Sequence, residues 1–184
     1  SAADMSVSGQ ANMYLTQGGA NTKATFSMDN HVVFSGTSEL DNGFEVTYSV
    51  EFDGDEGDQG EALDGNSIKV NTNGMGTVVF AGHGGSSAMS MMDDKTPNAY
   101  EEAWDGLDSG TTAVVINGYS GNNMITYTSE SFSGAVFTVA WIPSEATAST
   151  GNKSTYVDYG VTITPEMVDG LSLGYAAGTT EITA

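Results

Sequence analysis

Residues 44–52 read Phe-Glu-Val-Thr-Tyr-Ser-Val-Glu-Phe, so every second side chain in this stretch is apolar. Successive side chains of a β-strand point to opposite faces, whereas a helix, with 3.6 residues per turn, would scatter the two kinds around its circumference. The stretch therefore predicts a strand with one polar and one apolar face. The apolar face would carry Phe44, Val46, Tyr48, Val50 and Phe52.

Eight further stretches between residues 4 and 177 repeat this alternation. Their apolar faces are rich in β-branched and aromatic residues, which a pleated surface favours. The sequence therefore predicts about nine strands. The apolar positions of the other eight fall within residues 5–15, 24–34, 68–70, 78–80, 125–127, 137–141, 157–163 and 171–177.

The connections alternate between two kinds. Tight turns rich in Asn, Asp, Ser and Gly are expected at residues 41–43, 71–76, 129–134 and 164–170, because these residue types tolerate sharp reversals. The other connections are residues 17–21, 53–65, 82–122 and 143–153, and all but the first are longer and more polar. Short turns on one side and long loops on the other are typical of an up-and-down antiparallel transmembrane β-barrel.

Composition indicates one domain over residues 1–184. The chain has 39% hydrophobic residues and no Pro- or Ser-rich linker that would divide it. It has no cysteine, which excludes disulfides and thiolate metal ligands. No run of about 18 apolar residues occurs, so a spanning helix is not predicted.

The chain is strongly acidic. Its 24 acidic and 4 basic residues give a formal net charge of −20, which disfavours binding to nucleic acid and favours cations. Excess surface acid also serves solubility in salty surroundings. Both interpretations stay open, and both agree with the sequence.

The polar faces of the predicted strands carry mostly Ser, Thr, Asn and Gln, with few charges. A soluble sandwich places more Lys and Glu on its wet side, so this composition favours an enclosed, water-filled lumen. The charged residues and the histidine that fall on the polar faces by parity are candidate pore-wall residues. They are Lys23, His31, Lys69, Glu45 and Glu51.

Two further motifs suggest other chemistry. The acidic residues of 53–64 superficially resemble a calcium loop, but they lack flanking helices and a Glu at the twelfth position, so a solvated loop is expected. Asp53, Asp55 and Asp58 remain weak divalent candidates for loosely bound Ca²⁺, and no other cofactor is expected. His83-Gly84-Gly85-Ser86 could suggest the oxyanion loop of a hydrolase, but no Gly-x-Ser-x-Gly motif accompanies it, so no enzyme is predicted.

Four segments together resemble the Gram-negative general porins, those of marine alphaproteobacteria most of all. They are Val7-Ser8-Gly9, Glu39-Leu40-Asp41-Asn42-Gly43, residues 122–129 (Asn-Asn-Met-Ile-Thr-Tyr-Thr-Ser) and Phe132-Ser133-Gly134. The resemblance covers nearly the whole chain. It implies a homotrimeric barrel of about sixteen strands in the outer membrane, which contacts lipid and passes small hydrophilic solutes. Nine predicted strands then correspond to the N-terminal half of such a barrel. A smaller barrel of eight or ten strands is the alternative.

The resemblance also implies that the third long loop, about residues 82–122, folds inward and narrows the pore. Its acids would form the negative side of the constriction; they are Asp93, Asp94, Glu101, Glu102 and Asp105. The chain departs from the family pattern because it has no arginine, so we expect a weak transverse field and a cation preference. An exposed acidic loop outside the barrel is the alternative, but the large apolar residues Met89, Met91 and Met92 favour the inward fold.

A secreted or surface-layer β-sandwich, acidic and stabilised by calcium, is the main rival to the membrane interpretation. Alternation shows which residues share a face, but not what that face touches. Apolar side chains such as Phe26, Trp141 and Tyr159 should be exposed in a membrane barrel and should converge in a dry interior in a sandwich.

Overall fold

The computed structural model describes residues 4–16, 24–53, 63–92, 120–121, 123–146 and 153–183. Nine strands form one antiparallel sheet. They are β1 (Asp4–Thr16), β2 (Thr25–Glu39), β3 (Glu45–Asp53), β4 (Gly65–Asn71), β5 (Thr77–His83), β8 (Met124–Thr128), β9 (Ala135–Ala146), β10 (Lys153–Ile163) and β11 (Leu173–Thr183).

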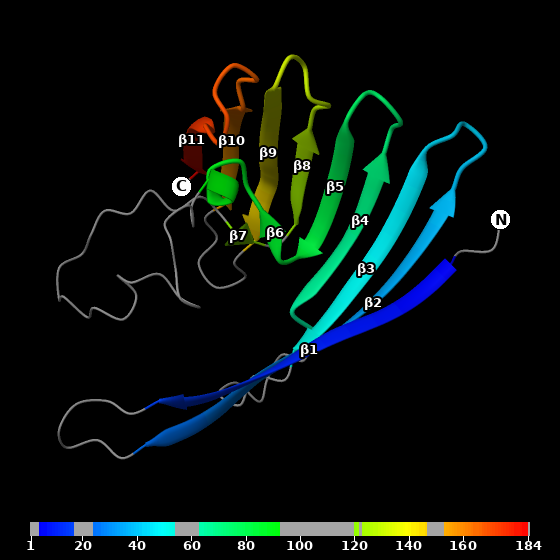
Figure 1. The fold of residues 1–184 in the computed structure, drawn as a ribbon, viewed down its shortest axis with the longest axis vertical. Coiled ribbons are helices and arrows are strands. Elements are labelled where there is room, and N and C mark those ends of the chain that lie inside the picture. The colour runs from blue at the N-terminus through cyan, green and yellow to red at the C-terminus, as the bar shows by residue number, and fades with distance from the viewer. Residues whose placement is uncertain are drawn as a thin grey trace.

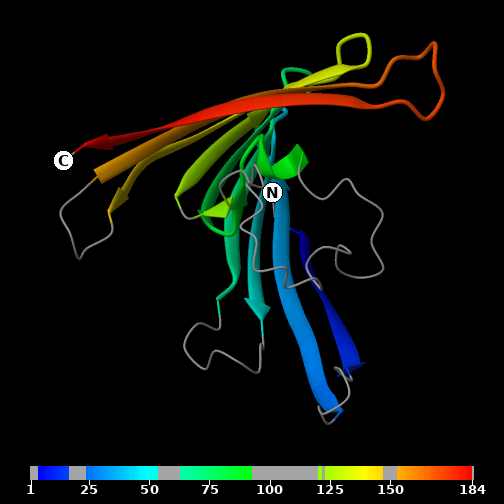
Figure 2. The ribbon, with the colours of Figure 1, turned by 90° about the vertical axis from the view of Figure 1, so that its left-hand side faces the viewer.

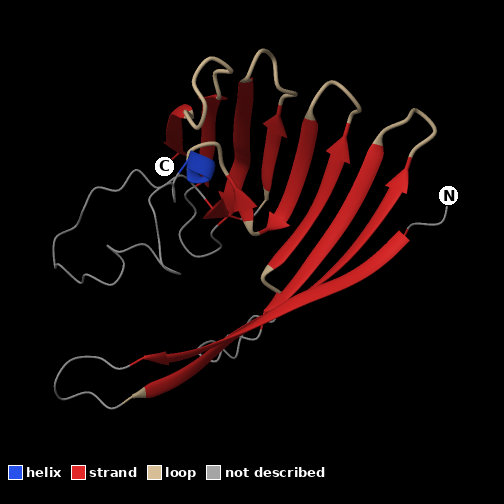
Figure 3. Cartoon of the chain, in the orientation of Figure 1, coloured by secondary structure: helices blue, strands red, loops and turns tan. Residues whose placement is uncertain are grey.

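Each strand pairs with its neighbours along the chain, in the order β1-β2-β3-β4-β5-β8-β9-β10-β11 (Figures 1 and 3). The connection between β5 and β8 contains the two-residue strands β6 (Gly85–Ser86) and β7 (Ser120–Gly121), which pair with each other, and the 3₁₀ turn η1 (Ser90–Met92). The predicted all-β, up-and-down antiparallel sheet is confirmed. It is an open sheet, with β1 and β11 at its two ends.

The four tight turns lie together at one end of the sheet, at the top of Figure 1. Asn42 Oδ1 accepts a hydrogen bond from the Phe44 backbone N–H at 3.1 Å, and Asn71 Oδ1 accepts one from Asn73 N–H at 3.0 Å. Asn73 and Gly43 adopt left-handed φ values of 53° and 80°. These residues therefore form the reversals for the reason that the sequence suggested, since Asn and Gly tolerate this backbone conformation.

The sheet bends strongly along its width, and η1 lies inside the bend (Figure 2). A small core fills the space between this inner face and residues 85–92. It contains the buried apolar side chains of Ala81, Ala88, Met124, Ala140, Ile142 and Tyr156. Among the described helical residues, no segment is long and apolar enough to cross a membrane.

Two strand ends differ from the sequence-based prediction. Residues 143–146 were expected in a loop, but β9 continues through Pro143 to Ala146. Its pairing with β10 is irregular there, since Tyr156 pairs with Ile142 and Ser154 with Glu145. A bulge accommodates proline within a strand because the missing N–H then costs no regular ladder bond. The second difference concerns β11, which continues to Thr183, beyond the last predicted apolar position at residue 177.

Candidate functional site

The register places the predicted apolar positions of all nine strands on one face of the sheet. One row across this face contains Tyr48, Ile68, Phe80, Ile125, Trp141 and Val157. Of these, Tyr48, Ile68, Phe80 and Trp141 are 44–51% exposed, and Phe26 and Tyr159 elsewhere on the face are 51% and 55% exposed. An exposed apolar surface of this extent is typical of a face that contacts a membrane or another protein. The convergence expected of a sandwich is absent from the described residues.

The opposite face lies inside the bend; it is mainly polar over β1 to β4 and carries the small apolar core over β5 to β10. Hydroxyl groups pair across neighbouring strands, with oxygen–oxygen distances of 2.6 Å for Ser6–Ser35 and 3.1 Å for Thr37–Thr47. The row Ser35–Ser49–Ser67 continues this lining across β2, β3 and β4. A wall of small hydroxyl side chains leaves room and hydrogen-bonding capacity for water.

The described wall candidates all share this polar face. Glu45 lies between Glu39 and Asn71, Lys69 lies between Thr47 and Val79, and Glu51 lies between Val33 and Gly65. His31 Nδ1 is 3.9 Å from Glu51 Oε1, and both side chains are about one-third exposed. The structure thus brings His31 and Glu51 together and leaves Lys69 and Glu45 at other levels of the wall.

Of the candidate ligands for a divalent metal ion, Asp53 is the one that the structure describes. Asp53 ends β3 beside His31, and its buried Oδ1 has no hydrogen-bond partner among the residues that the structure describes. In the part of the chain that the structure describes, no three His, Asp or Glu residues gather as metal ligands. Several predicted site residues lie outside the described residues. They are Lys23, Asp55, Asp58, Asp93, Asp94, Glu101, Glu102 and Asp105.

Residues 85–92, the beginning of the third long connection, lie on the polar face against β8, β10 and β11. Thr126 Oγ1 donates a hydrogen bond to the Ser86 carbonyl at 3.3 Å. The Asp158 carboxylate, which is fully buried, accepts the backbone N–H groups of Ala88 at 3.1 Å and Met89 at 2.8 Å. The Tyr156 hydroxyl donates to the same carboxylate at 2.9 Å. One acidic side chain on β10 therefore holds the loop backbone.

Glycines on β10 and β11 make room for the methionines of this segment. A β-carbon added at Gly160 would lie 2.7 Å from Met92 Cε, and one at Gly174 would lie 3.3 Å from Met92 Sδ. One added at Gly178 would lie 2.9 Å from Asp158 Cβ and 3.1 Å from Met89 Sδ. The glycines form a shallow trough, and Met89 and Met92 pack into it. We call Asp158, Tyr156 and this trough (Gly160, Gly174 and Gly178) the loop anchor.

The loop anchor was not predicted from the sequence. A signal was present, because Asp158 interrupts the apolar residues of 156–161 and has the same parity as Tyr156 and Gly160. An acidic side chain in the middle of a membrane strand is expected to have a hydrogen-bonding or charged partner, because burying a charge without one is costly. The partners are backbone N–H groups about 70 residues away, and their position is not readable from residue types.

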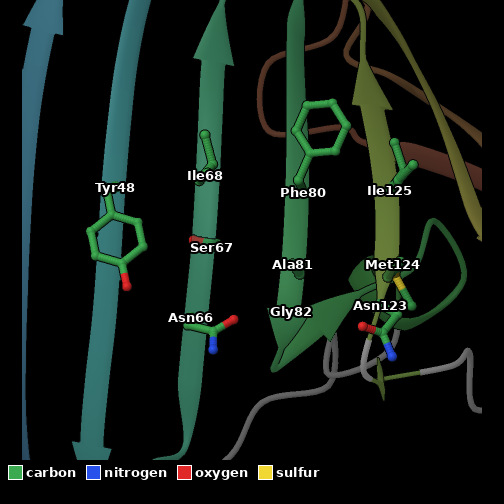
Figure 4. A pocket seen from close by; sticks show the side chains of 10 residues that line it. All are labelled: Tyr48, Asn66, Ser67, Ile68, Phe80, Ala81, Gly82, Asn123, Met124 and Ile125. Carbon is green, nitrogen blue, oxygen red and sulfur yellow. The ribbon is translucent and has the colours of Figure 1, made fainter.

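A shallow hollow of about 430 Å³ lies on the opposite, apolar side, where Figure 4 shows Tyr48, Ile68, Phe80 and Ile125 on four neighbouring strands. A bulge causes it. Asn66 pairs with His83 and Ser67 with Ala81, so Gly82 is the extra residue, and the Asn66 amide occupies the space that a β-carbon of Gly82 would need. The hollow is therefore a local irregularity at the bulge between β4 and β5.

The segment that suggested a hydrolase has structural roles. His83 ends β5, and its Nδ1 contacts the Asp64 carbonyl. Ser86 belongs to β6 and is exposed, and its carbonyl accepts the hydrogen bond from Thr126. These contacts hold the start of the third connection in place.

A meandering antiparallel β-sheet with an exposed apolar outer face and a polar, hydroxyl-lined inner face is typical of transmembrane β-barrel proteins. The chain belongs to the Gram-negative porin family, whose model matches residues 1–184. The match confirms the porin resemblance and places the protein in the outer membrane, but it does not single out marine alphaproteobacterial members. Family membership points to a channel and not to an enzyme. No curated protein and no solved structure matches the chain.

Proposed function

We propose that this porin is a passive diffusion channel for small hydrophilic solutes, with a preference for cations. The observation that carries the proposal is the division of the sheet into two faces. The apolar face suits hydrocarbon, and the hydroxyl-lined face suits water. Solutes would cross along the polar face without a chemical step and without a cofactor.

Fixed carboxylates on the polar face support the cation preference. Glu45, Glu51 and Asp53 lie on it, with Lys69 as a cationic neighbour. The apolar wall behind them has a low dielectric constant, which strengthens Coulomb attraction over its value in bulk water. The net charge of −20 acts in the same direction at longer range.

Steric sieving would come from the third long connection. Residues 85–92 occupy space on the polar face, which supports an inward course for the loop over residues 82–122. Its acids Asp93, Asp94, Glu101, Glu102 and Asp105 would then add negative charge at the narrowest level. A homotrimeric assembly and loose Ca²⁺ binding at the acidic residues of 53–64 are further parts of this proposal, suggested by the resemblance and by the acid content.

Planar-bilayer recording tests the function. We expect stepwise conductance and, under a tenfold salt gradient, a reversal potential of cation-selective sign that approaches about 59 mV for perfect selectivity. A reversal potential of the opposite sign would reject the cation preference. The absence of any conductance from protein that has folded into vesicles would reject the channel itself.

A further inference from the structure

We propose that Asp158 is the positioning residue that holds residues 87–92 on the inner wall and thereby sets the size limit for solutes. The inference rests on the proposed channel function and deepens it. Asp158 does not contact solutes itself, because its side chain is fully buried beneath the loop. It acts through the loop backbone that it binds.

The geometry favours a specific anchor over incidental packing. Both carboxylate oxygens are used, since Oδ1 accepts the Ala88 N–H and Oδ2 accepts the Met89 N–H and the Tyr156 hydroxyl. Hydrogen bonds to a carboxylate are shorter and stronger than those between neutral groups. Loss of the carboxylate would leave these backbone donors unsatisfied, which is the costly outcome in a buried site.

The anchor holds the segment in one position. Ser87 Oγ accepts the Ser90 N–H at 3.2 Å, and the Met92 N–H donates to the Met89 carbonyl at 3.0 Å, so residues 87–92 form a compact turn. Met89 packs at Gly178, which is the cross-strand partner of Asp158, and Met92 packs at Gly160 and Gly174. The turn therefore moves on or off the wall as a unit, and Asp158 lies at the centre of its contact.

A cysteine reporter tests the docking directly, because the native chain has no cysteine. Ser87 is fully buried, and Ser87→Cys is nearly isosteric, so a small water-soluble thiosulfonate reagent should react slowly with the folded full chain in vesicles. Asp158→Asn should speed this reaction by about tenfold or more, the effect of losing one charge-assisted hydrogen bond. Asp41→Asn removes the same charge from an exposed turn and should leave the rate unchanged.

Two milder variants keep the test informative if Asp158→Asn does not fold. Tyr156→Phe removes one donor, and Gly178→Ala places a methyl group against Asp158 and Met89. Each should speed labelling of Ser87→Cys, although by less than Asp158→Asn. Unchanged labelling in every folded anchor variant, or equal acceleration by Asp41→Asn, would overturn the anchor.

The channel readout separates positioning from stability. Asp158→Asn should raise the largest neutral polymer that enters the pore, whereas Asp41→Asn should not. Faster labelling with an unchanged size limit would overturn the sieving role of Asp158. If labelling responds as expected while neither the parent nor any variant conducts, the anchor stands and the proposed channel function fails.

Discussion

Placing a lysine on each face of the same strand tests which medium each face meets. Ile68 lies at the centre of β4 on the apolar face and is 44% exposed, and Ser67 is its neighbour on the polar face, between Ser49 and Ala81. Ile68→Lys and Ser67→Lys therefore introduce the same side chain at nearly the same depth. The new lysine points to the apolar face in one variant and to the polar face in the other.

The expected loss in free energy of unfolding for Ile68→Lys has two parts. Full burial of an isoleucine is worth about 1.5–3 kcal/mol, so the 44% that lipid would cover contributes about 0.7–1.3 kcal/mol. A lysine on the lipid face near the bilayer midplane costs about 2–4 kcal/mol more. We therefore expect a loss of about 3–5 kcal/mol. Ser67→Lys should change the free energy of unfolding by about 0.5 kcal/mol or less, as for a solvated position.

The assay is equilibrium denaturant unfolding of the full chain in lipid vesicles, followed by tryptophan fluorescence. The two variants should differ by about 2.5 kcal/mol or more. Similar losses in both, or a larger loss for Ser67→Lys, would refute the assignment of the two faces. A small loss for both would show that the apolar face meets water.

Two further pairs of variants test the turns and the wall. Gly134→Ala should destabilise the protein by about 2–3 kcal/mol, because a left-handed φ of 81° strains alanine and its β-carbon would clash with the Thr164 carbonyl oxygen. Gly43→Ala, with a similar φ but open space around it, should cost only about 1 kcal/mol by the same unfolding assay, and equal losses would contradict the role of the close contact. Glu51→Gln should lower the cation-to-anion permeability ratio and Lys69→Gln should raise it, as read from reversal potentials. Shifts in the same direction would contradict their place on one shared wall.

The strands and their faces were predictable because a period of two in the sequence fixes both. Residues 44–52 predicted β3 to within one residue, and the Asn- and Gly-rich segments predicted the turns. The predicted end of the strand that became β9 was wrong, because a proline was given more weight than the strand pattern around it. Pro143 suggested a loop, yet a bulge accommodates it within β9, because the pairing of both neighbouring strands is already irregular or absent at that point.

The site was less predictable than the fold. Parity placed His31, Glu45, Glu51 and Lys69 on the polar face, as the register shows. The anchoring of residues 87–92 by Asp158 was not predictable. The Asp158 carboxylate binds backbone N–H groups that lie about 70 residues away in the sequence, and residue types do not show which backbone groups will come close to it. The methionines indicated that this segment is not purely solvated, but only the structure shows that glycines receive them.

Fluorescence of Trp141 gives the most direct test of the central claim, that the apolar face meets hydrocarbon. Trp141 is 45% exposed on that face, and Trp104→Phe leaves it as the single tryptophan of the chain. In vesicles, lipids with brominated acyl chains should quench its emission strongly, and aqueous iodide should have little effect. Strong quenching by iodide, with none by brominated lipid, would contradict the account.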